Sequence, residues 1–200
     1  MAIAINGSSP IRFTGTPANN VDITSASFTP PSDSLLVACV SADTNGNADD
    51  ITISVSGGSL TWTNRVERDP GEGGGHQAGH CSIWTAEQPT STAMTVSARR
   101  TAGDGSTGRI SVKVYVVTGA DVGGDPIGTV GEGSSVTNDI TPNAYTSTVN
   151  NSRGFGCASD WNQLGVPVST DTEDGADYAG ALSAVSLHKA ADTATSGSTV

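Results

Sequence analysis

Residues 108–131 read GRISVKVYVVTGADVGGDPIGTVG, and this stretch indicates the architecture of the whole chain. One set of alternate residues is apolar throughout: Ile110, Val112, Val114 and Val116. The residues between them become apolar toward the end of the stretch: Ser111, Lys113, Tyr115 and Val117. A period of two is that of a β-strand, in which successive side chains point to opposite faces. Gly119 and residues 123–126, GGDP, favour turns. We expect a strand in the middle of a sheet.

Similar strand-like segments recur along the chain between turn-forming residues. Residues 34–41, SLLVACVS, form a continuous apolar run of strand length, which predicts a buried strand. Residues 51–55 alternate apolar and polar side chains. Further strands are predicted at residues 21–28, 60–68, 81–86, 94–98, 136–140, 145–149, 154–159 and 182–188. Residues 99–108 are predicted to be a glycine-rich loop, and residues 171–180 to hold at most one helical turn.

Regular strands without a long helical period predict the fold class. We expect an all-β protein: a two-sheet antiparallel β-sandwich, jelly-roll-like, with little or no helix. Residues 1–20 are expected to be an N-terminal arm or edge strand, and residues 21–200 the sandwich domain. Residues 193–200 resemble a turn and the first residues of a strand. The closing strand therefore lies elsewhere in the topology, belongs to a longer natural chain, or is supplied by a neighbouring subunit.

Composition excludes several classes of partner. The 200 residues carry a net charge of −11 with only nine Lys and Arg, whereas nucleic acids and anionic membranes require basic surface. We expect no nucleic-acid or membrane partner, since no apolar run reaches membrane-spanning length. The first residues, MAIAINGSSP, lack the basic and apolar regions of a signal peptide. We therefore expect synthesis in the cytoplasm without a signal peptide.

The three cysteines, Cys39, Cys81 and Cys157, all lie in apolar strand-like segments. An odd number of cysteines without a secretion signal favours reduced thiols over a disulfide framework. We expect them to be buried as small hydrophobic side chains.

Two segments carry residue types that bind metals. Alternate residues of one polar loop have side chains with oxygen ligands suited to calcium: Asp43, Asn45, Asn47 and Asp49. Ala48 and Ser54 stand where an EF-hand has Gly and Glu, so a solvated loop is the alternative. His76, His80 and Cys81 are zinc-ligand types, but their spacing suits a helix and the flanking glycines do not. No other cofactor is expected.

Carboxylates and aromatic residues near the C-terminus suggest a surface for glycans. Trp161, Asp174 and Tyr178 are candidate contacts, because sugars stack on aromatic rings and hydrogen-bond to carboxylates. Asp171, Glu173 and Asp177 add acidic groups, and paired carboxylates can hydrolyse glycosides. A solvated acidic loop is the alternative. We find no nucleophile elbow, phosphate-binding loop or dinucleotide fingerprint, and expect the protein not to be an enzyme.

An ordered series of phrases resembles a known family. They are SLLVACVSADT (34–44), GGSLTWTNRVERD (57–69), CSIWTAEQPTSTAMTVSA (81–98), VKVYVVTGAD (112–121), PIG (126–128), TPNAYTSTVNNSRGFGCASDWNQLG (141–165) and AGALSAVSLHKAADTATSGSTV (179–200). Together they resemble the β-sandwich virion proteins of tailed phages that infect actinobacteria, named minor tail or capsid-associated proteins. That family continues into one more strand containing Trp, which this sequence lacks.

The resemblance implies a structural protein on the virion surface, either decorating the capsid or forming part of the tail tip. It implies other virion proteins as partners, namely the major capsid protein or tail proteins. A homo-oligomer is expected, and cyclic symmetry suggests a trimer. A carbohydrate-binding module that contacts the host envelope is the first alternative, and a glycan depolymerase is the second.

Overall fold

The computed structural model describes residues 2–43, 51–69, 79–102, 107–133, 146–160, 172–179 and 182–197, with only the backbone described at residues 102, 160 and 172–179. These residues form twelve strands and no helix, and therefore contain no apolar helix long enough to cross a membrane. The strands are β1 (Ala4–Ile5), β2 (Phe13–Gly15), β3 (Asp22–Thr24), β4 (Ser34–Asp43), β5 (Ile51–Gly57), β6 (Thr63–Arg68), β7 (Gly79–Gln88), β8 (Val96–Ala102), β9 (Ile110–Thr118), β10 (Phe155–Asp160), β11 (Thr172–Ala179) and β12 (Leu182–His188).

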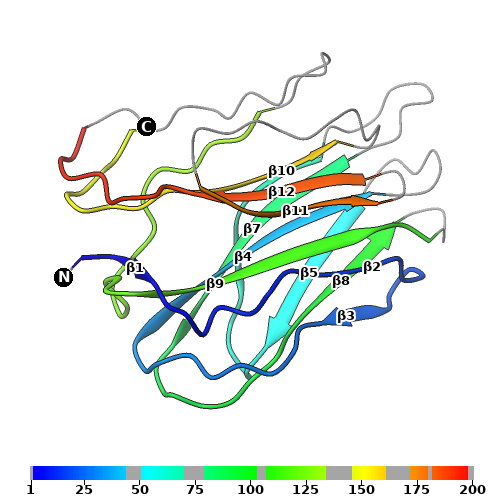
Figure 1. Ribbon diagram of the computed structural model, residues 1–200, viewed down its shortest axis with the longest axis horizontal. Helices are drawn as coiled ribbons and strands as arrows, with labels where there is room; N and C mark the ends of the chain where they lie inside the picture. Colours follow the sequence, from blue (N-terminus) through cyan, green and yellow to red (C-terminus); the bar gives the residue numbers. More distant parts are fainter. Residues whose placement is uncertain are drawn as a thin grey trace.

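The described strands form three antiparallel sheets stacked in three layers (Figure 1). The middle sheet has the order β1-β9-β4-β7-β6, and β2 also pairs with β9. One outer sheet has the order β10-β12-β11 and the other β3-β8-β5. The predicted all-β antiparallel sandwich is confirmed, although the sheets number three where two were expected. The jelly-roll connectivity stays a prediction.

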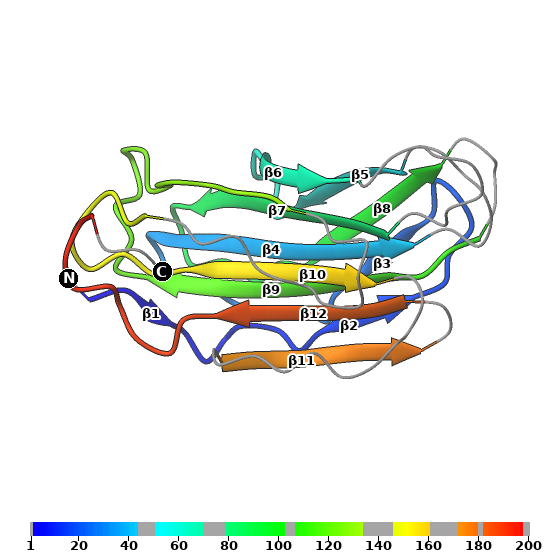
Figure 2. The same ribbon diagram turned by 90° about the horizontal axis from the view of Figure 1, so that it is seen from above.

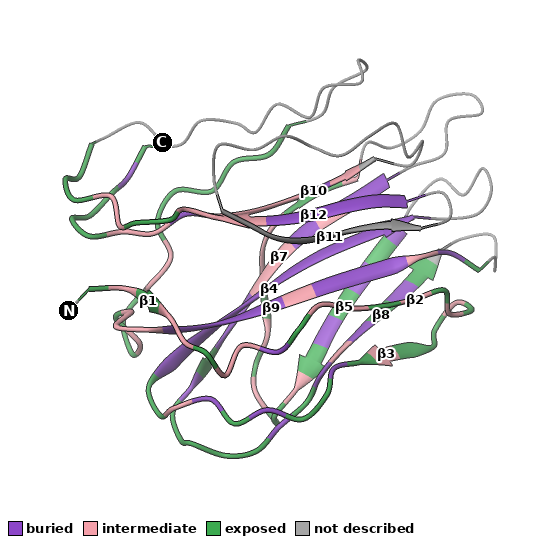
Figure 3. Cartoon of the chain, viewed as in Figure 1, coloured by how far each residue is buried: buried purple, intermediate pink, exposed green. Residues whose placement is uncertain are grey.

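β4 and β9 form the centre of the middle sheet. They pair antiparallel from Leu35 with Val117 to Ala42 with Ile110, and β7 pairs along the other side of β4. All ten residues of β4 are buried, as Figure 3 shows by its colouring. This explains the continuous apolar run in the sequence, because a strand covered on both faces has no exposed side. The predictions of a buried strand at residues 34–41 and a central strand after residue 108 are both confirmed.

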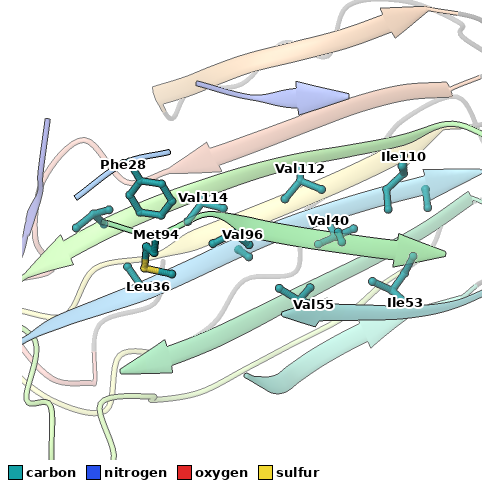
Figure 4. Packing of buried hydrophobic residues seen from close by; sticks show 14 of the residues in the cluster. Phe28, Leu36, Val40, Ile53, Val55, Met94, Val96, Ile110, Val112 and Val114 are labelled. Atoms are coloured by element: carbon teal, nitrogen blue, oxygen red, sulfur yellow. The ribbon is translucent and has the colours of Figure 1, made fainter. Parts of the chain in front are cut away.

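The larger core lies between the middle sheet and the β3-β8-β5 sheet (Figure 4). Leu36, Val40 and Val114 contribute to it from the middle sheet. Ile53 and Val55 contribute from β5, whose side chains alternate between buried and exposed as its sequence predicts. Aliphatic burial on this scale is the main source of stability in such a domain.

A second core lies on the opposite face of the middle sheet, beneath the β10-β12-β11 sheet. Leu35, Val37 and Tyr115 are buried there, and Phe155 of β10 packs against them. Seen from above, the strands of this outer sheet run along those of the middle sheet (Figure 2). Small residues let β10 approach the backbone beneath it: the Ser41 hydroxyl donates a hydrogen bond of 3.1 Å to the carbonyl oxygen of Ala158.

The N-terminal residues cover the outer edge of β9. β1 pairs with β9 near Thr118, and β2 pairs with it near Val112. Between them, the Ser9 hydroxyl accepts a hydrogen bond of 2.9 Å from the amide of Val116. Lys113 Nζ donates to the carbonyl oxygen of Pro10 over 3.0 Å. Residues 4–15 are thus bound to their own chain, and they cover a strand edge that would otherwise pair with other proteins.

Three local predictions were wrong. Residues 146–149 form no strand, because the chain bends there before the turn at residues 150–151, and the strand predicted at residues 136–140 lies outside the described residues. Residues 99–102 continue β8 and do not form a loop, because their backbone pairs with β5 as far as Ala102 opposite Ile51. Residues 172–179 form β11 and not a helical turn, because they pair with β12 across a bulge between Glu173 and Ala176. In these last two places backbone pairing with an existing strand outweighs a polar local sequence.

The described C-terminal residues pack as irregular chain. Thr193 makes an isolated bridge with Ser152, and the amide of Gly197 donates a hydrogen bond of 2.7 Å to the carbonyl oxygen of Ser147. The closing strand considered in the sequence is not among the described strands, and its location stays open.

Candidate functional site

Many strand termini meet at one end of the sandwich, on the right in Figure 1, which we call the loop end. The strand register defines it through four pairs: Asp43 with Gly79, Ile51 with Ala102, Ala42 with Ile110, and Asp160 with Ser183. Of the residues predicted to bind calcium or glycan, Asp43 is one of these termini, the rest of the calcium loop follows it, and Trp161 follows Asp160 in the sequence. The loop end is therefore the first place to examine for a site.

Asp43, the first residue of the predicted calcium loop, is the last residue of β4 and is buried. Its amide donates a hydrogen bond of 2.9 Å to the carbonyl oxygen of Arg109, which ties the end of β4 to the start of β9. Asn45, Asn47 and Asp49 lie outside the described residues, so the calcium site stays a prediction. Among the described residues, no group of three or more His, Cys, Asp or Glu side chains is placed to hold a metal ion.

His80 is buried beside a carboxylate at the same end. Its Nδ1 lies 3.9 Å from Oδ2 of Asp69, and that carboxylate accepts a hydrogen bond of 2.8 Å from the amide of Ile51. Cys81 is adjacent to His80 in β7, and neighbouring residues of a strand point to opposite faces. His76 lies outside the described residues. His80 and Cys81 thus do not converge in the way a zinc site requires.

The predicted glycan contacts are placed by the backbone of the outer sheet. Tyr178 and Asp160 both lie opposite Ser183, on either side of β12. They are two strand spacings apart, about 10 Å. Trp161 follows Asp160 in the sequence but lies outside the described residues. Asp174 precedes Tyr178 by four residues, or about 13 Å along the strand, and lies in the bulged part of β11.

The three cysteines converge between the middle sheet and β10, and we call them the thiol cluster. The Cys39 thiol donates to the carbonyl oxygen of Gly156 over 3.7 Å. The Cys157 thiol lies 3.5 Å from the carbonyl oxygen of Ser82, next to Cys81 in β7. All three thiols are free; Cys39 is buried as expected, whereas Cys81 and Cys157 are partly exposed where burial was expected.

Contacts between the thiols change their acidity. A hydrogen bond with Cys157, together with burial, raises the pKa of the Cys81 thiol well above its ordinary value of 9.0. A hydrogen bond with Cys39, together with burial, raises the pKa of Cys157 well above 9.0. Near neutral pH both thiols are therefore protonated. The sequence did not indicate this cluster, because the contact depends on how β10 lies on the middle sheet.

A pocket of about 260 Å³ lies at the opposite end of the sandwich, where β9 ends. Its walls come from the turn after β9, from residues 148–151 and from Ile3. Asp121 and Asp125 contribute carboxylates, and Gly119 has a φ of +81° that suits glycine in the turn. The sequence predicted the turn but not the pocket, which needs residues 148–151 to lie against it.

Comparison of the chain with protein-family models, with curated proteins and with solved structures found no match.

Proposed function

We propose that this chain is a non-enzymatic structural protein of a tailed-phage virion, which decorates the capsid or forms part of the tail tip. The observation that carries the proposal is the position in the fold of the sequence segments that resemble the phage virion proteins. The segments at residues 34–44 and 141–165 contain β4 and β10, and those at residues 81–98 and 112–121 contain most of β7 and β9 together with the start of β8. The resemblance therefore concerns the strands that build the middle sheet and the layer above it.

The architecture supports a role on an exposed particle. The central strands are covered on both faces, and residues 4–15 cover the outer edge of β9. The described central strands of such a domain offer few locally unfolded segments to proteases. The net charge of −11 favours a partner with basic surface, such as another virion protein. A cyclic homo-oligomer, with a trimer as the first expectation, belongs to the same proposal.

Purified particles of a phage that encodes this chain test the proposal. We expect peptides of the chain, after density-gradient purification and a high-salt wash, in a fixed ratio to the major capsid protein or to a tail protein. Electron cryomicroscopy then distinguishes the two positions, since a decoration protein follows the icosahedral lattice and a tail protein does not. The proposal fails if infected cells contain the chain and washed particles do not.

Glycan binding at the loop end is a second candidate, favoured by one observation. Tyr178 and Asp160, the residue that precedes Trp161 in the sequence, lie on either side of Ser183, so the backbone brings these two positions to the same part of one sheet. The distance of about 10 Å between these backbone positions is short enough for both residues to reach one oligosaccharide.

Titration calorimetry with fragments of host-envelope polysaccharide measures this binding. We expect Trp161→Ala and Tyr178→Ala each to weaken it about tenfold, because each removes a stacking surface. Val149→Ala is the control, since Val149 is 60% exposed and lines the pocket at the opposite end. Equal affinities for the two variants and the wild type would exclude this site.

A further inference from the structure

The thiol cluster joins two layers of the sandwich at a point where three separate parts of the chain meet. Cys39 comes from β4 and Cys81 from β7, both in the middle sheet, and Cys157 comes from β10 above them. The Cys157 sulfur lies 3.9 Å from the carbonyl oxygen of Val40 and 3.5 Å from that of Ser82. It therefore lies over the seam between β4 and β7, within reach of both other thiols.

Differences in solvent exposure among the three cysteines indicate which pair can be oxidised. Cys39 is only 1% exposed and its thiol donates to the Gly156 carbonyl oxygen, so solvent does not reach it. Cys81 and Cys157 are both partly exposed, and their thiols contact one another. Of the three cysteines, this pair is therefore the more accessible to a dissolved oxidant.

We propose that Cys81 and Cys157 form a disulfide that joins β7 to β10 when the protein meets a low-molecular-weight disulfide such as oxidised glutathione. The thiolate of one cysteine attacks the glutathione disulfide, forms a mixed disulfide and releases one glutathione thiolate. The second cysteine loses its proton and attacks the protein sulfur of that mixed disulfide, which releases the second glutathione. Two cysteine thiols are oxidised by two electrons, and the glutathione disulfide is reduced by two.

The surroundings of the pair determine the rate. Since the pKa values of both thiols are raised, the reactive thiolate is scarce at neutral pH and its fraction increases with pH. The disulfide therefore forms slowly at pH 7 and about 30-fold faster at pH 8.5, since the thiolate fraction rises about tenfold per pH unit below the pKa. The chain stays reduced in a reducing cytoplasm and becomes cross-linked over a long residence in oxidising surroundings.

The disulfide has a mechanical consequence for the fold. Cys81 and Cys157 lie on different sheets, so the bond converts a packed interface between layers into a covalent one. It closes a loop of about 75 residues, for which the loss of unfolded-chain entropy predicts a rise of the thermal midpoint on the order of 10 °C. Dithiothreitol is expected to reverse this rise.

The test incubates the folded, reduced wild type with oxidised glutathione and maps disulfide-linked peptides by mass spectrometry without reduction. We expect a peptide that links Cys81 to Cys157, together with the raised thermal midpoint. Cys39→Ser is the matched control and should form the same link. Cys81→Ser and Cys157→Ser should retain the reduced wild-type midpoint after oxidation.

Three results would overturn the proposal. They are a Cys39–Cys157 link in the wild type, a glutathione adduct that is never resolved, or a link that forms only in denaturant. The disulfide-linked peptides of the wild type are enough to support or overturn the proposal, so the conclusion does not depend on how well the serine variants fold.

Discussion

Replacing Tyr115 with alanine lowers the free energy of unfolding by about 3–5 kcal/mol. Tyr115 is fully buried in β9, on the face of the middle sheet that the β10-β12-β11 sheet covers. Its ring centroid lies 5.2 Å from that of Phe155 and 5.8 Å from that of His188. The ring thus touches β10 and β12 together, and its removal leaves a cavity between two layers. Urea unfolding measures the change.

Hydrogen exchange shows which strands lose stability in this variant. In Tyr115→Ala, the amides of β10 and β12 should exchange faster, whereas those of β5 and β8, beyond the opposite face, should keep their protection. Val114→Ala is the matched control, because Val114 is the adjacent buried residue of β9 and packs into the other core. It should show the reverse pattern. A uniform loss of protection in both variants would contradict the separation into two cores.

Replacing Gly108 with alanine costs about 2–4 kcal/mol, even though the change adds one methyl group. A Cβ at this position would lie 2.0 Å from the carbonyl oxygen of Asp43 and 2.9 Å from Cζ of Arg100. Asp43 is held by its amide hydrogen bond to Arg109, so its backbone cannot move without separating the end of β4 from the start of β9. Denaturant unfolding at neutral pH measures the cost.

Gly156→Ala is the control for this variant. A Cβ at Gly156 meets no described atom within 4 Å, although this glycine also lies in a strand that packs on the middle sheet. We expect a change within about 0.5 kcal/mol, or a slight gain from the reduced freedom of the unfolded chain. Similar costs for the two variants would show that Gly108 is not sterically constrained.

The inner strands were predictable because the pattern of apolar residues in each one matches the faces of the strand that are buried. The run at residues 34–41 and the alternation at residues 51–55 state directly which faces are covered. β11 was not predictable, since TEDGADYA has no apolar face and becomes a strand through pairing with β12. The end of β8 was missed for the same reason, as its Arg99 and Arg100 carry no strand pattern but pair with β5.

The number of layers and the thiol cluster could not be predicted from the sequence, for a different reason. A period of two assigns each residue to a face of its strand, but it does not say which sheet covers that face. Cys39, Cys81 and Cys157 each appear as a small buried residue until the position of β10 is known. The calcium and glycan contacts stay predictions, because Asn45, Asn47, Asp49 and Trp161 lie outside the described residues.

The covering of β9 by residues 4–15 affects the order in which the chain folds during synthesis. These residues leave the ribosome before their partners at residues 110–118, which come about 100 residues later. At typical rates of translation the first strands wait about 5–20 s for a strand to bind. Residues 4–15 are thus the last described part of the middle sheet to be paired. Throughout that interval a nascent copy can offer the same segment to the β9 edge of another molecule.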